Sequence, residues 1–191
     1  MYELLFATNN AHKVQEIQPL MPDDIKVLSL KDAGINVEID EPYDTLEENA
    51  IEKASVIHAL TGKNCFSEDT GLEVKGLNGA PGVRSARYSG EKATHAENID
   101  LLLKNLKGIT NRSARFRTVI ALQWNETVHL FEGICPGTII SEKQGEQGFG
   151  YDPVFIPDGA DKTFGEMNAG EKALFSHRAK ALEKLINFLT H

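Results

Sequence analysis

The sequence predicts a mixed α/β or α+β fold in which helices flank a mixed β-sheet. Apolar runs typical of strands alternate along the chain with segments of helical periodicity. The chain contains no internal repeat and no linker that marks a boundary, so we expect a single domain over residues 1–191. Its length suits one large domain or two intimately packed lobes, and a hydrophobic content of 41% is enough for a substantial core.

The first predicted elements are a strand, a polar turn and a helix. The apolar residues 4–7 indicate a buried strand, and Asn10 is suited to cap the helix that follows. The helical periodicity directs three apolar side chains inward, namely Val14, Ile17 and Leu20. Unpaired amides at the start of a helix and the helix dipole favour an anion, so this turn is a candidate anion-binding site.

The middle of the chain is predicted to contain a second helix and several short strands. Thr45 starts a capping-box pattern before a helix that ends at Gly62. Cys65 and Phe66 then indicate a short strand. Two further short strands are expected at residues 27–28 and 37–39. The glycine-rich residues 76–90 are expected to form a long loop.

The second half is predicted to contain a helix, a hairpin and a last helix. Thr94 starts another capping-box pattern, and the helix after it ends at Gly108. A hairpin over residues 113–131 is expected to turn at Asn125-Glu126. The last helix is expected to begin near Ser176. Two more short strands are expected at residues 139–140 and 154–156.

The composition excludes several classes of protein. The formal net charge of −8 disfavours nucleic-acid binding, in which a basic surface supplies most of the affinity. The two cysteines, Cys65 and Cys135, lack metal-ligand spacing and are expected to be small buried hydrophobic residues. The N-terminus has no basic region typical of a signal peptide, and no apolar run is long enough to span a membrane. We therefore expect a cytoplasmic protein.

Acidic and basic side chains occur at positions suited to a metal ion and phosphates. Asp69 follows a short apolar strand, and Lys13 follows the candidate anion-binding turn by one helical turn. Carboxylate oxygens suit Mg²⁺, which usually keeps waters that a phosphate can replace. On residue type alone, however, Asp69 is better explained as a turn residue before Gly71, and Lys13 as a solvated helix lysine. Phe149 lies between glycines, where a backbone can approach a flat ligand closely.

Taken together, these segments resemble the inosine triphosphate pyrophosphatase family, which acts on non-standard purine nucleoside triphosphates. The first block is Thr8-Asn9-Asn10-Ala11-His12-Lys13. The central block covers residues 67–74 and continues through residues 79–88. The third block covers residues 148–155, and the last is Ser176-His177-Arg178 with Lys172 before it. The blocks occur in order and cover nearly the whole chain.

The resemblance implies a fold, a cofactor and an assembly. The implied fold is α/β, with an elongated mixed β-sheet flanked by helices and two lobes with an active-site cleft between them. The implied cofactor is Mg²⁺, bound by Glu41 and Asp69, with Asp40 as the less favoured register for the first ligand. The implied assembly is a homodimer with a small-molecule nucleotide as substrate, and neither a nucleic acid nor a membrane is an expected partner.

The resemblance also implies residue roles. Asp69 is the implied general base, and Lys53 is the second implied catalytic residue. The residues implied to bind the substrate are Thr8, Asn9, Asn10, Ala11, His12, Lys13, Thr70, Phe149, Gly150, Tyr151, Asp152, Lys172, His177 and Arg178. Asn9 replaces the family's usual glycine, and asparagine tolerates a left-handed conformation better than most residues.

The implied activity is Mg²⁺-dependent hydrolysis of ITP, dITP and XTP to the monophosphate and pyrophosphate, which cleanses the nucleotide pool. One alternative is a related enzyme that prefers other altered nucleotides, such as modified pyrimidine triphosphates; the block at residues 176–178 argues against it. Another is a catalytically silent nucleotide-binding protein. The presence of both a metal ligand and a base argues against that alternative.

Overall fold

The computed structural model describes residues 2–191. Its strands are β1 (Tyr2–Phe6), β2 (Ile25–Ser29), β3 (Cys65–Val74), β4 (Pro81–Gly82), β5 (Ser113–Trp124), β6 (Thr127–Ile139) and β7 (Phe155–Pro157). Its α-helices are α1 (Ala11–Ile17), α2 (Leu46–Thr61), α3 (His95–Asn105), α4 (Ala169–Ala173) and α5 (His177–Thr190). Short 3₁₀ turns occur at Gln18–Leu20, Lys75–Leu77, Ser85–Arg87, Asp152–Val154 and Phe164–Glu166.

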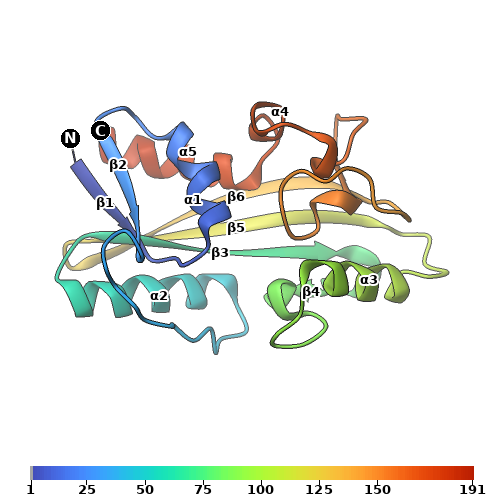
Figure 1. Ribbon diagram of the computed structural model, residues 1–191, viewed down its shortest axis with the longest axis horizontal. Coiled ribbons are helices and arrows are strands. Elements are labelled where there is room, and N and C mark those ends of the chain that lie inside the picture. Colours follow the sequence, from blue (N-terminus) through green and yellow to red (C-terminus); the bar gives the residue numbers. More distant parts are fainter. Residues whose placement is uncertain (1) are drawn as a thin grey trace. The chain divides into compact units, whose positions relative to one another are not determined.

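The strands form a mixed sheet in the order β2-β1-β3-β5-β6-β7, and β4 pairs with β3 (Figure 1). β1 is parallel to both β2 and β3, whereas β4 and β7 are antiparallel to their partners. The predicted mixed α/β fold is therefore confirmed. The chain forms two compact units: unit 1 contains residues 2–69, 118–133 and 178–191, and unit 2 contains residues 70–117 and 134–177. The expectation of a single domain stays a prediction.

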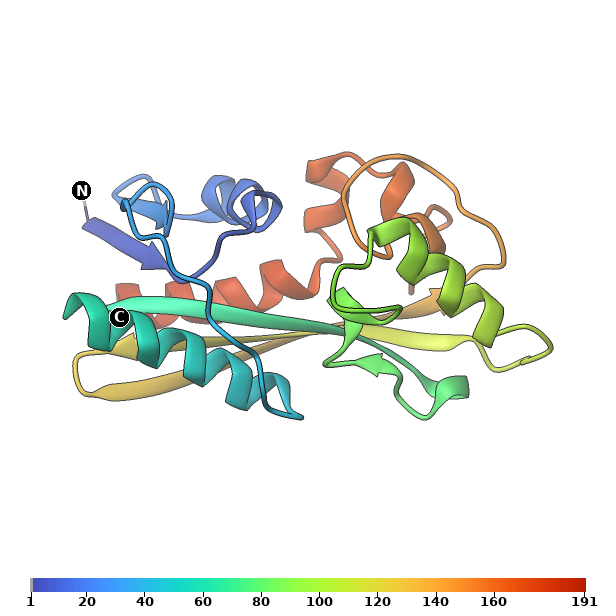
Figure 2. The same ribbon diagram turned by 60° about the horizontal axis from the view of Figure 1, so that its bottom comes forward.

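Unit 1 has helices on both faces of its strands (Figures 1 and 2). On one face, Ile17 of α1 and Leu182 of α5 pack with Phe66 of β3 and other buried apolar residues. On the other face, α2 lies close to β3, because the small residues Ala50 and Ala54 are fully buried there. Burial of these apolar faces positions all three helices over the sheet.

Unit 2 has its own core around the other ends of the long strands. Leu72 of β3 and Phe116 of β5 pack with Leu102 of α3, Phe155 of β7 and Phe164. The capping box of α3 is complete, since the Thr94 side chain accepts from the Glu97 amide and the Glu97 carboxylate accepts from the Thr94 amide. This cap and the buried face of α3 determine where the helix begins.

Several predictions about local structure are confirmed. Asn10 caps α1, and Gly62 ends α2 in the left-handed region at φ 65°. The hairpin turns at Asn125-Glu126, between the neighbouring strands β5 and β6. Both cysteines are free and buried, as expected. Each of these predictions rests on local chemistry, such as a cap, a glycine or a two-residue turn.

Other predictions are wrong. Residues 37–39 form no strand, and Leu20 is 37% exposed in a 3₁₀ turn. The strand that begins at Cys65 continues to Val74, so Asp69 lies within a strand and is not a turn residue. The strand expected at residues 139–140 is the end of β6, Val154 precedes β7, and α4 was not expected. The acidic residues of β3 interrupt the apolar pattern that would predict a long buried strand. They can be buried because residues elsewhere in the chain pair with them.

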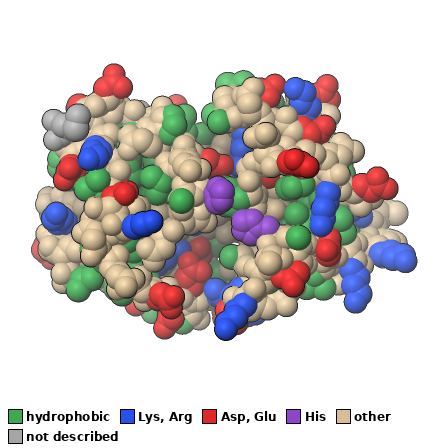
Figure 3. Space-filling view, in the orientation of Figure 1, with side chains coloured by type: hydrophobic (Ala, Val, Ile, Leu, Met, Phe, Trp, Pro, Cys, Tyr) green, Lys and Arg blue, Asp and Glu red, His purple; other side chains and the backbone are tan. Residues whose placement is uncertain are grey.

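Surface charge and helix length bear on the binding of nucleic acids and membranes. On the face drawn in Figure 3, Lys and Arg side chains are interspersed with Asp and Glu, and no basic stripe crosses the coloured residues. Within residues 2–191, each helix is too short or too polar to cross a membrane.

Gly71 offers a test of the packing of β3 against β4. A Cβ at Gly71 would lie 2.6 Å from the carbonyl oxygen of Gly82, a backbone atom that cannot rotate away. We expect Gly71→Ala to lower the free energy of unfolding by about 1–3 kcal/mol, since overpacking forces the backbone apart. Urea denaturation measures the change. Gly170→Ala, in helix α4, is the control and is expected to be neutral or stabilising; equal stability of both variants would contradict this packing.

Candidate functional site

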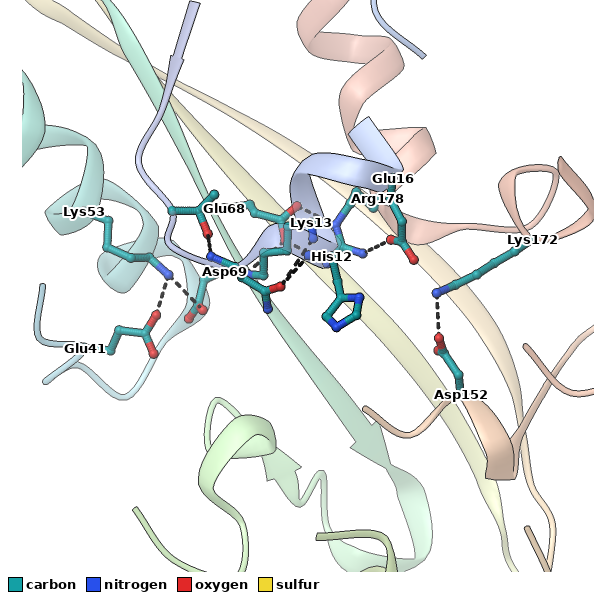
Figure 4. A network of polar contacts seen from close by, with 12 residues as sticks. His12, Lys13, Glu16, Glu41, Lys53, Glu68, Asp69, Asp152, Lys172 and Arg178 are labelled. Atoms are coloured by element: carbon teal, nitrogen blue, oxygen red, sulfur yellow. Dashed lines mark hydrogen bonds and ion pairs between the residues drawn. The ribbon is translucent and has the colours of Figure 1, made fainter. Parts of the chain in front are cut away.

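Strand β3 directs two consecutive carboxylates to opposite faces (Figure 4). Side chains alternate along a strand, so Asp69 points with Ser67 and Cys65 toward α2, whereas Glu68 points with Phe66 toward α1 and α5. Two hydrogen bonds confirm the first direction: the Ser67 hydroxyl donates to the Ala50 carbonyl, and the Cys65 thiol donates to the Ala54 carbonyl. Glu68 and Asp69 therefore have separate surroundings although they are adjacent in sequence.

Asp69 forms a buried cluster with Lys53 and Glu41. The Lys53 Nζ donates to Asp69 Oδ1 at 3.2 Å and to Glu41 Oε1 at 2.5 Å. Asp69 and Lys53 are both almost fully buried. Burial disfavours the Lys53 ammonium, but the charges of Asp69 and Glu41 outweigh this effect and raise the pKa of Lys53. Asp40 is exposed, so the structure brings Glu41 rather than Asp40 into the cluster.

Only one of the two oxygens of the Asp69 carboxyl group accepts a hydrogen bond within the described residues. Its Oδ2 atom is buried and has no hydrogen-bond partner within residues 2–191. Burial raises the pKa of Asp69, and the charge of Lys53 opposes that rise. A buried carboxylate oxygen without a partner is costly unless a cation or a donor binds it. Asp69 Oδ2 is therefore suited to bind a ligand.

The donor set around Asp69 suits a hard cation. Asp69 and Glu41 supply carboxylate oxygens, which are the ligands that Mg²⁺ prefers. The described residues hold no group of three or more His, Cys, Asp or Glu side chains that could enclose a metal ion. Mg²⁺ commonly takes one or two carboxylates and completes its shell with waters and phosphate oxygens, so two protein ligands fit it.

Glu68 is at the centre of a second buried cluster in unit 1. Arg178 donates from Nε to Glu68 Oε2 and from Nη2 to Glu68 Oε1, both at 2.8 Å. Lys13 Nζ lies 3.1 Å from Glu68 Oε1, and Glu16 accepts from Arg178 Nη1. Burial disfavours the Glu68 charge, but Arg178 and Lys13 outweigh it and lower the pKa of Glu68 well below its usual range. Glu68 is therefore ionised at any physiological pH.

The candidate anion-binding turn differs from its expected form. The Asn10 side chain accepts from the amides of His12 and Lys13, at 3.0 Å and 3.4 Å, so the cap itself uses these amides. Thr8 Oγ1 accepts from the Asn10 amide at 3.1 Å. The described non-glycine residues with positive φ are Asn78 and Asn125, so Asn9 does not use a left-handed conformation. Its side-chain amide donates to the carbonyl of Val37 instead, at 3.1 Å.

In unit 2, Asp152 organises the turn that carries Phe149. Its Oδ2 atom accepts from the Phe149 amide at 3.0 Å and from Lys172 Nζ at 2.7 Å. Lys172 Nζ also lies 5.2 Å from the centroid of the Phe149 ring. A Cβ at Gly148 would lie 2.0 Å from Asp152 Oδ2, which explains the glycine at that position. Gly148 and Gly150 both have positive φ.

Two predicted substrate-binding residues are deeply buried. The Tyr151 hydroxyl donates to the Ser85 carbonyl at 2.7 Å, and burial raises the pKa of Tyr151. The His177 ring stacks on Phe116 with centroids 4.8 Å apart. Thr70, by contrast, is half-buried, and Ala11 and His12 are exposed at the start of α1. Tyr151 and His177 are therefore packed as parts of the core of unit 2.

The sequence reasoning grouped Lys172, His177 and Arg178, and the structure separates their partners. Lys172 bonds to Asp152 in unit 2, whereas the guanidinium of Arg178 bonds to Glu68 and Glu16 in unit 1. Internal carboxylates neutralise Arg178, and its role in base recognition stays a prediction. Glu68 and Glu16 were not predicted to have a role. Strand alternation could have separated Glu68 from Asp69 once β3 was known to be long.

Comparisons with known proteins agree with this arrangement of motifs. The Ham1 family model matches residues 4–188. A dITP/XTP pyrophosphatase of Flavobacterium psychrophilum is 50% identical over 186 residues, which cover 97% of this chain and 98% of that protein. A dITP/XTP pyrophosphatase of Porphyromonas gingivalis is 47% identical over 190 residues, covering 99% and 98%. A solved HAM1 protein from Coxiella burnetii has a TM-score of 0.90 and 38% identity, covering 100% and 99%.

The Glu68 cluster makes a prediction about stability. Glu68→Gln keeps the side-chain size but removes the charge that neutralises Arg178 and Lys13, and we expect the free energy of unfolding to fall by about 3–5 kcal/mol at neutral pH. The folded pKa of Glu68 is lowered, so its contribution is present above the unfolded pKa and is lost as pH falls through the folded pKa. The difference between wild type and variant should therefore persist to about pH 4 and shrink only in stronger acid.

Urea denaturation at several pH values measures this difference. Glu91→Gln is the control, because the Glu91 side chain is 75% exposed and lies 3.8 Å from Arg84 and from Arg87. It should have little effect on stability. Equal destabilisation by the two substitutions would show that the buried cluster does not stabilise unit 1.

Proposed function

Because the chain belongs to the Ham1 family, we propose that it hydrolyses ITP, dITP and XTP to the corresponding monophosphates and pyrophosphate. The observation that carries this proposal is the near full-length identity of 47–50% to proteins named dITP/XTP pyrophosphatase. The buried Asp69 cluster supports it, because this cluster supplies a carboxylate with a raised pKa next to a lysine. A carboxylate base and a neighbouring cation are groups that can serve the hydrolysis of a phosphoanhydride.

The proposed cofactor is Mg²⁺, and Glu41 and Asp69 are the residues that would bind it. The fit rests on the buried Asp69 Oδ2, which has no partner in the described part of the chain. When bound, Mg²⁺ neutralises phosphate charge and stabilises the leaving pyrophosphate. The Lys53 ammonium contacts both carboxylates and so holds them close together.

The proposed chemistry assigns water activation to Asp69. Its carboxylate accepts a proton from a water, and the water oxygen forms a bond to the α-phosphorus. The bond between the α-phosphorus and the bridging oxygen then breaks, and pyrophosphate leaves with that oxygen. Lys53 and Lys13 offset the charge of the phosphates, as buried ammonium groups do most effectively where water is scarce. Thr8, Asn10 and Thr70 are the proposed neutral phosphate contacts.

Base selection is assigned to the turn that carries Phe149 and to basic residues. Phe149 is proposed to stack on the purine, with Gly150, Tyr151 and Asp152 as its neighbours in the turn. Lys172, His177 and Arg178 are proposed to present donors to the 6-oxo group of hypoxanthine or xanthine. The 6-amino group of adenine is itself a donor, so it would face the donors of the site and leave them without an acceptor. A site built this way rejects ATP strongly. The homodimer and the cytoplasmic location stay predictions, and analytical ultracentrifugation would measure the first.

The proposal predicts a substrate and metal profile. Pyrophosphate release should be fastest with ITP, dITP and XTP, slow with ATP, and abolished by chelation of Mg²⁺. Asp69→Asn should lower kcat/KM for ITP by at least about 10²-fold, because it removes the base. Asp23→Asn, an exposed aspartate in the same unit, is the control. A preference for modified pyrimidine triphosphates would support the alternative enzyme, and no release with any nucleotide would support a silent nucleotide-binding protein.

The raised pKa of Asp69 predicts the acid limb of the pH profile. Asp69 acts as a base only when it is deprotonated, so activity should fall as pH decreases through its pKa, at a pH above the ordinary aspartate range. Lys53 lowers the pKa of Asp69, so Lys53→Met should move the residual activity's acid limb to higher pH as well as reduce the rate. Lys63→Met, at an exposed lysine after α2, should leave the limb in place. An acid limb that Lys53→Met does not move would contradict the assignment.

A further inference from the structure

Three hydrogen bonds hold the turn that carries Phe149 in place. Asp152 accepts from the Phe149 amide, and the buried Tyr151 hydroxyl donates to the Ser85 carbonyl at 2.7 Å. The third tie joins the turn to α3: the Gly150 amide donates to Nδ1 of His95 at 3.1 Å. His95 lies in the capping-box pattern of α3, and none of the blocks that resemble the pyrophosphatase family contains it.

The position of the His95 backbone is set by helix α3. It is the first residue of α3, directly after the capping box of Thr94 and Glu97. Asn98, one turn further on, donates to the Ala86 carbonyl and accepts from the Ser89 amide. Ile99 and Leu102 anchor the helix in the core of unit 2. Helix α3, labelled in Figure 1, belongs to unit 2, and the His95 side chain at its start accepts from the Gly150 amide of the turn.

Phe149 depends on such ties because both of its neighbours are glycines. Gly148 and Gly150 have φ of 73° and 63°, and the space where a Cβ of Gly150 would lie is open. Glycines leave the backbone with more conformational freedom than any other residue, so hydrogen bonds must fix the Phe149 ring. The ring centroids of His95 and Phe149 are 6.1 Å apart, and the ring planes are tilted by 41°. This aromatic contact adds to the hydrogen bond at Gly150.

We propose that His95 is a positioning residue: its neutral Nδ1 accepts from the Gly150 amide and so holds Phe149 in the place where it stacks on the substrate base. This inference rests on the proposed function, because it concerns the base-stacking role of Phe149. The bond requires the tautomer with hydrogen on Nε2.

The charged groups near this contact are engaged with other partners. On α3, Glu97 accepts from Thr94, and Asp100 pairs with Lys143 at 2.7 Å. On the other side of the Phe149 ring, Lys172 pairs with Asp152. The Gly150 bond therefore depends on the Nδ1 acceptor of the His95 ring.

Two substitutions of His95 test the acceptor atom and the ring separately. His95→Asn places a side-chain oxygen close to the position of Nδ1 and keeps an acceptor, whereas His95→Phe keeps a ring and removes the acceptor. We expect His95→Phe to raise KM for ITP several-fold with little change in kcat, and His95→Asn to restore KM. His58→Phe, at a half-buried histidine of unit 1, is the control.

A second measurement is independent of the substrate. The Gly150 amide in a ¹H–¹⁵N NMR spectrum should shift and lose hydrogen-exchange protection in His95→Phe, and His95→Asn should keep most of that protection. Unchanged KM values together with an unaffected Gly150 amide would overturn the proposal, as would equal increases in KM in both His95 variants. If the wild type hydrolyses no ITP, the proposed function fails, and the hydrogen-exchange protection of the Gly150 amide still decides whether His95 positions the turn.

Discussion

Unit 1 depends on the neutralisation of two consecutive buried carboxylates in strand β3. An unpaired buried charge costs several kcal/mol, so each face of the strand must supply cations. Helix α2 supplies Lys53 to Asp69, while α1 and α5 supply Lys13 and Arg178 to Glu68. Three helices from distant parts of the sequence are therefore positioned by one pair of residues. Their apolar faces select the side of the sheet, and the ion pairs select the position along it.

The two carboxylates differ in what remains available for chemistry. Both oxygens of Glu68 accept hydrogen bonds from Arg178, and its pKa is lowered, so it stays charged and structural. Asp69 has one oxygen bonded to Lys53 and one without a partner, and burial raises its pKa. Neighbouring acids whose surroundings move their pKa values apart commonly have different roles. Here the separation arises from the alternation of a single strand, which places the two groups in different surroundings.

The sequence predicted those features that local chemistry determines. The caps of α1 and α3, the left-handed Gly62 and the hairpin turn at Asn125-Glu126 depend on residues within a few positions of each other. The length of β3 could not be predicted in this way, because its acidic residues disrupt the apolar pattern of a buried strand. The burial of Glu68 depends on Arg178, which is 110 residues further along the chain. Motif resemblance brought Lys53 and Asp69 together, but the cluster around Glu68 required the tertiary structure.

Phe149 illustrates how unit 2 solves a different problem. Close approach to a flat ligand favours glycines, and glycines on both sides leave the aromatic ring without local restraint. Asp152 restrains it by accepting from the Phe149 amide, and its charge is needed because the same oxygen neutralises the buried Lys172. Gly148 must lack a side chain so that this carboxylate can approach. His95 adds a restraint from a helix whose position is set by the core. A change in these restraints should alter how well a base is recognised, whereas the pKa of Asp69 is governed mainly by its burial and by Lys53, Glu41 and Lys13 of unit 1.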